Sequence, residues 1–153
     1  VAETVRTRVA GWPYRAHVVE GEADRLSAMK AATVALACSG TVTTEVALAG
    51  TPMAVGYRLA PLTYAIIKRL IRTKFVTLFN IAADRYVAPE LLQSACTGPN
   101  LARELALRLD DEDLRRGQIE AQSQALDKMG RGGPDPSEAA ALAVLKILDR
   151  SPA

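Results

Sequence analysis

A short polar turn, Ser39-Gly40-Thr41, follows the apolar run at residues 33–37 and precedes a helix-like segment at residues 42–49. The apolar run is typical of a buried strand, and open α/β sheets bind ligands where such strands end. Gly40 permits a tight turn and the close approach of a ligand, while a helix start offers unpaired N–H groups and a positive dipole end to a phosphate. With the hydroxyls of Ser39 and Thr41, the turn predicts a site for a phosphorylated ligand. A helix cap that binds nothing is the alternative.

Glu45 lies four residues beyond Thr41, on the face of the predicted helix that carries the turn. A carboxylate at this place can accept hydrogen bonds from two vicinal ribose hydroxyls. Glutamate is also favoured in the first turns of any helix, so its position alone is not decisive. Together with the turn, Glu45 favours a nucleotide-sugar site.

Three further segments contribute polar side chains that we expect at the same edge of the sheet. Arg58 follows a predicted strand and is placed to meet a phosphate. Asn80 follows another predicted strand, where it either binds a ligand or shapes the turn. Glu90 and Gln93, at the start of the next predicted helix, are weaker candidates for the same crevice.

The segment at residues 64–75 has the pattern of an amphipathic helix. Its basic face carries Lys68, Arg69 and Arg72, and its apolar face carries Ile66, Ile67, Leu70 and Ile71. The basic face suits contact with anionic lipid head groups or an acidic lipid substrate. An ordinary core-facing helix with a solvated basic face is the simpler interpretation, and the two are compatible.

Composition narrows the classes of function. The 153 residues suffice for one domain with a core, and 49% hydrophobic with 24% charged residues is typical of a globular chain. A net charge of +2 and 5% aromatic residues do not favour nucleic-acid binding. Cys38 and Cys96 lack metal or redox spacing and indicate a reducing compartment. His17, the single histidine, is expected to be structural, so we expect no metal site.

Apolar runs alternate with helix-like segments, which predicts an α/β fold with a doubly wound, mostly parallel, Rossmann-like sheet. The expected strands are residues 15–19, 33–37, 53–57 and 76–79. The expected helices are residues 2–10, 22–32, 42–49 and 61–73, then most of the chain from residue 88, with a last helix from residue 136. Because complete doubly wound domains commonly have about five or six strands, we expect the chain to be part of a longer one.

The segment from Ser39 to Arg58 resembles the core of the lipid-A-disaccharide synthase family. The resemblance continues, in order and spacing, through Pro61-Leu62-Thr63, Lys68-Arg69-Leu70, Val76 to Asn80 and Pro89-Glu90-Leu91-Leu92-Gln93. It covers residues 15–95 closely and the later helices more loosely. The Ser-Gly-Thr turn with its glutamate is shared by many GT-B glycosyltransferases, whereas the basic helix and the Asn80 loop are more specific. One departure is Phe79 before Asn80, where the family more often has proline.

The resemblance implies a GT-B glycosyltransferase of a Gram-negative bacterium. It implies transfer of 2,3-diacylglucosamine from UDP to 2,3-diacylglucosamine 1-phosphate (lipid X), which forms the β(1→6) disaccharide of lipid A and releases UDP without a cofactor. By position, the turn at residues 39–41 would line the diphosphate, Glu45 the ribose and Asn80 the nucleotide sugar. The general base would lie in an N-terminal half that this chain lacks.

The resemblance also implies an organisation and a location. Residues 1–97 would form a partial Rossmann-like UDP-sugar-binding domain, and residues 98–153 C-terminal helices that pack back on the domain junction. The enzyme would be cytoplasmic and peripheral on the inner membrane, and a homodimer with exchanged segments is compatible with it. Another GT-B UDP-sugar enzyme (a MurG-like transferase or a UDP-GlcNAc epimerase) and a non-catalytic α/β interaction domain remain alternatives.

Overall fold

The computed structural model describes residues 2–61, 63–64, 69 and 73–148. Most of the helix predicted at residues 61–73 therefore lies outside the described residues, as do Lys68 and Arg72 of its basic face. Arg69 is described as helical and exposed.

Three parallel strands form the sheet of the described chain: β1 (Ala35–Ala37), β2 (Met53–Tyr57) and β3 (Glu90–Leu92), in the order β1-β2-β3. Ala37 pairs with Val55, and Tyr57 pairs with Leu92. The carboxyl ends of the strands therefore meet at one edge, and the predicted parallel α/β architecture is confirmed.

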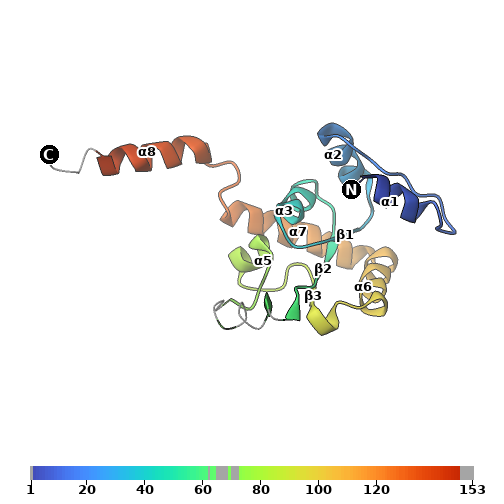
Figure 1. Cartoon of the computed structure of the whole chain (residues 1–153). Coiled ribbons are helices and arrows are strands. Elements are labelled where there is room, and N and C mark those ends of the chain that lie inside the picture. The colour runs from blue at the N-terminus through green and yellow to red at the C-terminus, as the bar shows by residue number, and fades with distance from the viewer. Residues whose placement is uncertain (1, 62, 65–68, 70–72, 149–153) are drawn as a thin grey trace.

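Seven α-helices and one 3₁₀ turn accompany this sheet in the described residues (Figure 1). They are α1 (Ala2–Val9), α2 (Glu22–Ala31), α3 (Thr41–Leu48), α5 (Leu78–Ala83), η1 (Gln93–Ala95), α6 (Gly98–Asp110), α7 (Glu112–Lys128) and α8 (Pro136–Leu148). The predicted helices near residues 2–10, 22–32, 42–49 and from 136 are confirmed to within one or two residues.

Strand β2 is buried because helices cover both faces of the sheet. Side chains of a strand alternate between faces, and Met53 and Val55 belong to the core cluster that includes residues of α3, α5 and α7. On the opposite face, a Cβ added at Gly56 would lie 3.0 Å from Leu101 Cδ2 of α6. The sheet is thus covered from both sides, as expected for a nearly continuous apolar strand.

Helix α7 is fastened to the amino end of β2 by two buried amides. Gln118 Nε2 donates to the Met53 carbonyl at 2.8 Å, and Gln122 Nε2 donates to the Thr51 carbonyl at 3.1 Å. Because unpaired buried carbonyls are costly, these two bonds fix the position of α7, which also packs against α3, α5 and α6.

Two of the four predicted strands are wrong. Residues 15–19 form no strand, and His17 is exposed rather than packed in a core. A short extended segment becomes a strand only by pairing, and no described strand pairs with this one. Residues 76–79 instead lead into α5, with Thr77 in an extended conformation before its first residue, Leu78.

The third strand occupies a segment that the sequence predicts as the start of a helix. Proline followed by glutamate, as in Pro89-Glu90, is typical of a first helical turn. In the structure Glu90 opens β3, and its carboxylate binds backbone N–H groups of residues 76 and 77. This tertiary contact, which local sequence cannot reveal, favours the extended conformation. The helical region begins only at α6.

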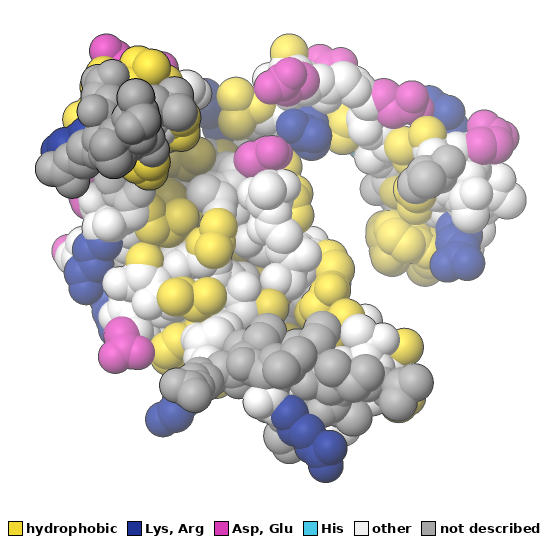
Figure 2. All heavy atoms as spheres, turned by 60° about the vertical axis from the view of Figure 1, so that its left-hand side comes forward, with side chains coloured by type: hydrophobic (Ala, Val, Ile, Leu, Met, Phe, Trp, Pro, Cys, Tyr) yellow, Lys and Arg dark blue, Asp and Glu magenta, His cyan; other side chains and the backbone are white. Residues whose placement is uncertain are grey.

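Helix α8 extends away from the sheet, and its described apolar side chains are exposed (Figures 1 and 2). Its start is fixed locally, since Asp135 Oδ1 accepts the N–H groups of Ser137 and Glu138 at 2.7 and 3.4 Å. These N–H groups lower the pKa of the Asp135 carboxyl. The side chain therefore caps α8 in its ionised form.

Substitution of Gly56 by alanine tests the close approach of β2 and α6. The new Cβ would lie 3.0 Å from Leu101 and 3.3 Å from Cys96 Sγ, so we expect a loss of about 1–3 kcal/mol in the free energy of unfolding. Gly117→Ala is the control, because nothing lies within 4 Å of its added Cβ and alanine favours a helix by about 0.5–1 kcal/mol. Urea unfolding measures both. Equal stability of the two variants would contradict the packing described.

Candidate functional site

A pocket of about 450 Å³ opens at the carboxyl edge of the sheet. Each strand contributes residues at or just beyond its end: Ser39 after β1, Tyr57 and Leu59 at β2, and Leu92 and Gln93 at β3. The remaining wall consists of Tyr64, Thr73, Lys74, Phe75, Val76 and Ile81. The pocket thus lies at the edge where the sequence predicts a ligand site, and its lining is largely apolar.

The turn before α3 has the geometry expected for contact with an anion. Gly40 adopts φ 150° and ψ −168°, a conformation that other residues rarely adopt. No side chain caps α3, and the first amides of a helix have no intrahelical acceptor. Ser39 lines the pocket, while Gly40 and Thr41 are exposed beside it. The turn therefore offers N–H groups and hydroxyls next to the cavity.

Gln93 connects two loops of the pocket. In the amide orientation that satisfies both partners, its nitrogen donates to the Leu59 carbonyl at 3.2 Å and its oxygen accepts from the Leu59 N–H at 3.1 Å. Gln93 also has φ 50°, which is uncommon for a residue other than glycine. Its amide is therefore occupied by the loop after β2, although the residue lines the cavity.

Glu45 faces helix α2. Its Oε2 lies 3.2 Å from Arg25 Nη2, and the two side chains are 39% and 51% exposed. Glu45 does not line the pocket beside Ser39. An exposed ion pair of this kind contributes little to stability, so the Glu45 carboxylate can exchange Arg25 for another partner at low cost.

Arg58 is exposed directly after β2, and the pocket lining does not include it. Arg58, the predicted phosphate contact, therefore follows β2 at the carboxyl edge of the sheet, but its side chain is not part of the pocket wall.

Asn80 and Glu90 occupy a place that differs from the prediction. Asn80 is fully buried, and its amide bonds to the backbone of Val87 and Ala88 and to Glu90. Glu90 binds the chain before α5. Both side chains lie behind a wall of the pocket, and neither is part of its lining.

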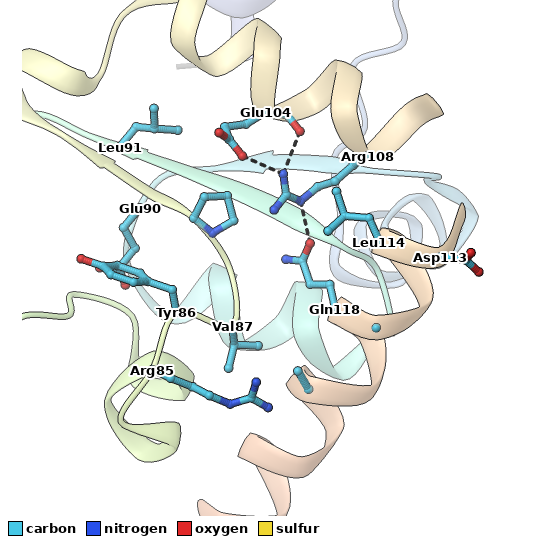
Figure 3. A pocket seen from close by; sticks show the side chains of 13 residues that line it. Arg85, Tyr86, Val87, Glu90, Leu91, Glu104, Arg108, Asp113, Leu114 and Gln118 are labelled. Carbon is cyan, nitrogen blue, oxygen red and sulfur yellow. Dashed lines mark hydrogen bonds and ion pairs between the residues drawn. The ribbon is translucent and has the colours of Figure 1, made fainter. Parts of the chain in front are cut away.

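A second pocket, of about 630 Å³, lies between β3, α6 and α7 (Figure 3). At its floor Arg108 Nε donates to Gln118 Oε1 at 2.6 Å, and Arg108 Nη1 lies 3.0 Å from Glu104 Oε2. The Arg108 side chain is 7% exposed and that of Glu104 is 21% exposed. Arg108 is thus paired with Glu104 and hydrogen-bonded to Gln118, and this network connects α6 to α7.

The described residues contain no group of three or more His, Cys, Asp or Glu side chains arranged to hold a metal ion. In the same ranges, no helix combines the length and apolar character needed to cross a bilayer.

Sequence reasoning missed most of the cavity wall. Tyr57 and Leu59 could have been found, since they lie at the end of a correctly predicted strand. Residues 73–76 could not have been found from the sequence. It predicts a strand at residues 76–79, where the chain instead forms a loop and the start of α5.

These features define an α/β domain with a three-stranded parallel sheet and a pocket at the carboxyl edge of that sheet, the edge at which open α/β sheets bind ligands. The family profile described as "LpxB: Lipid-A-disaccharide synthetase" matches residues 10–144. The chain therefore belongs to the lipid-A-disaccharide synthase family.

Relatives carry the same description. "Lipid-A-disaccharide synthase" of Rhodospirillum centenum is 41% identical over 150 residues, which are 98% of this chain and 37% of that protein. The proteins of the same name from Bradyrhizobium diazoefficiens and Gluconobacter oxydans are 43% and 38% identical over 145 and 149 residues, which are 95% and 97% of this chain and 37% and 36% of those proteins. The chain thus spans little more than a third of the length of these relatives.

Substitution of Arg108 by methionine tests the network below the second pocket. The change leaves Gln118 Oε1 without its donor and Glu104 without its counter-charge, so we expect a loss of about 2–3 kcal/mol in the free energy of unfolding. Arg116→Met is the matched control, since the Arg116–Asp113 pair is exposed and should contribute within about 0.5 kcal/mol. Denaturant unfolding of both variants gives the comparison. A cost for Arg108→Met no larger than for Arg116→Met would rule out a structural role for the network.

Proposed function

We propose that this chain is the donor-binding part of a lipid-A-disaccharide synthase. In this proposal the complete enzyme transfers 2,3-diacylglucosamine from UDP to lipid X, forms a β(1→6) disaccharide and releases UDP. Family membership supports the reaction, and the pocket beside the uncapped start of α3 supports the assignment of the donor nucleotide to this chain.

The turn at residues 39–41 binds the UDP diphosphate in this proposal. Backbone N–H groups at the start of α3, the helix dipole and the two hydroxyls all favour an anion at that place. Glu45 binds the ribose after it releases Arg25, and Arg58 meets a phosphate from the rim. The general base and the acceptor site would come from the part of the enzyme outside this chain.

The proposed organisation follows a GT-B glycosyltransferase. Residues 1–97 contribute the nucleotide-sugar side of the Rossmann-like domain, and residues 98–153 the C-terminal helices. Helices α6 and α7 contact the sheet or the helices beside it, whereas the exposed apolar side chains of α8 suit packing back on the domain junction or exchange in a homodimer. The enzyme would be cytoplasmic and peripheral on the inner membrane.

The reaction is tested with the full-length protein that contains this chain. Incubation with UDP-2,3-diacylglucosamine and lipid X should yield UDP and the disaccharide by mass spectrometry. Glu45→Ala should raise the dissociation constant for UDP by roughly 10- to 100-fold, because a hydrogen bond to a charged group contributes about 1.5–3 kcal/mol. Calorimetric titration with UDP measures this change.

Arg25→Ala is the matched control for Glu45. If Glu45 binds ribose, removal of its ion-pair partner should leave UDP affinity unchanged or improve it. A loss equal to that of Glu45→Ala would show that Glu45 acts through Arg25 and would remove its role as a ribose contact. Absence of disaccharide from the folded wild-type enzyme would discard the lipid A reaction and call for a screen of other UDP-sugars.

The basic segment tests membrane association separately from nucleotide binding. Replacement of Lys68, Arg69 and Arg72 by glutamine should reduce co-sedimentation of the full-length protein with vesicles rich in anionic phospholipid, since each basic residue near such a surface contributes about 1 kcal/mol. UDP affinity should not change. Undiminished co-sedimentation would assign these residues to an ordinary solvated face and would keep a MurG-like activity open.

A further inference from the structure

The carboxylate of Glu90 organises the chain that forms one wall of the carboxyl-edge pocket. Glu90 Oε1 accepts the N–H of Thr77 at 2.7 Å and its hydroxyl at 2.6 Å, and Oε2 accepts the N–H of Val76 at 2.9 Å. Helix α5 begins one residue later and has no side-chain cap from its own N-cap residue. Glu90, which is distant in sequence, therefore caps the start of α5. Its negative charge strengthens these hydrogen bonds.

Asn80 fixes the same carboxylate from the other side. Its amide nitrogen donates to Glu90 Oε1 and to the Ala88 carbonyl, both at 2.9 Å. Its oxygen accepts the N–H groups of Val87 and Ala88 at 2.8 and 3.1 Å. An amide has two hydrogens to donate and two lone pairs, so Asn80 has no bonding capacity left for a ligand, and it is fully buried.

These bonds hold the chain at residues 73–77 against the start of β3. Thr73, Lys74, Phe75 and Val76 line the pocket in front of it. The segment has no regular secondary structure of its own. Apart from the local bonds between Thr73 and Phe75 and the helix bond from the Ile81 N–H to the Thr77 carbonyl, the hydrogen bonds described for it run to Glu90. The position of the wall thus depends on a side chain that the pocket does not contact.

We propose that Asn80 and Glu90 are positioning residues for nucleotide-sugar binding, which act by holding residues 73–77 as a wall of the pocket. This inference rests on the proposed function, because it takes the pocket to be the donor site. The two side chains do not touch the ligand. Removal of the Glu90 carboxylate leaves the N–H groups of Val76 and Thr77 without their acceptor and so loosens the wall.

Two single variants of the full-length protein and the double variant that combines them test the pair. Glu90→Gln should weaken UDP binding by roughly 10-fold or more. The Val76 N–H lies 3.1 and 2.9 Å from the two carboxylate oxygens, so either orientation of the new amide directs an NH₂ group at this donor. Asn80→Asp places a second carboxylate against Glu90 and should weaken binding further. The double variant removes that repulsion and should bind UDP more tightly than Asn80→Asp.

Two comparisons separate positioning from a general loss of stability. Hydrogen exchange of the Val76 and Thr77 amides should accelerate in Glu90→Gln. Leu126→Ala is the control: it removes a core side chain of α7 that is 2% exposed and should lower the melting temperature, yet leave these amides and UDP affinity unchanged well below that temperature.

Thr77→Val, which deletes a single hydroxyl bond to Glu90, is a mild variant that should fold and weaken binding by roughly 3- to 10-fold.

The outcomes distinguish this inference from the proposed function. Failure of the wild-type protein to bind UDP would overturn both. If the wild type binds UDP, unchanged affinity in Glu90→Gln and Thr77→Val would overturn the positioning role alone. A double variant that binds no better than Asn80→Asp would show that Asn80 contacts the ligand directly, and would also overturn it.

Discussion

The structure depends on its central strand, β2, which is buried on both faces. The backbone polar groups at the two ends of this strand need hydrogen-bond partners. Met53, Ala54 and Val55 are fully buried, so the backbone at the ends of β2 must be satisfied by protein groups. At the amino end, Gln118 and Gln122 bind the backbone carbonyls and so fix α7. At the carboxyl end, the parallel register gathers the loops around a pocket. The amino end thus anchors α7, and the carboxyl end borders the pocket.

The sequence predicts the elements whose signals are local. A run of apolar residues without charge identifies β1 and β2, and Gly40 identifies the turn between β1 and α3. The sequence fails where a distant contact decides the conformation. Pro89 and Glu90 predict the start of a helix. In the structure the Glu90 carboxylate instead binds another loop, and the Glu90 backbone pairs with β2. The apolar run at residues 76–79 predicts a strand. In the structure the Glu90 carboxylate instead stabilises the start of helix α5 at this place.

The predicted site residues show a related limit. The rule that ligands bind at the carboxyl ends of strands points to the edge of the sheet where Ser39 and Gln93 line the pocket. The rule gives the place of a side chain but not what its polar atoms bond to. Asn80 lies near the predicted edge with its amide fully used within the chain, and Glu45 is turned toward Arg25 on α2. Both partners are remote in sequence, so spacing along one helix or strand cannot reveal them.

A binding site built from loops is precise only if other interactions hold the loops. Here two separate contacts do so. Gln93, in its unusual left-handed conformation, ties the loop after β3 to Leu59 in the loop after β2, and Glu90 ties the segment before α5 to the start of β3. The polar side chains that surround the pocket therefore divide into two groups. Those at the start of α3 leave the helix without a side-chain cap and are proposed to bind the anion, while those at β3 form hydrogen bonds within the chain that hold the loops around the cavity. This division explains why a largely apolar pocket is accompanied by so many polar residues that do not line it.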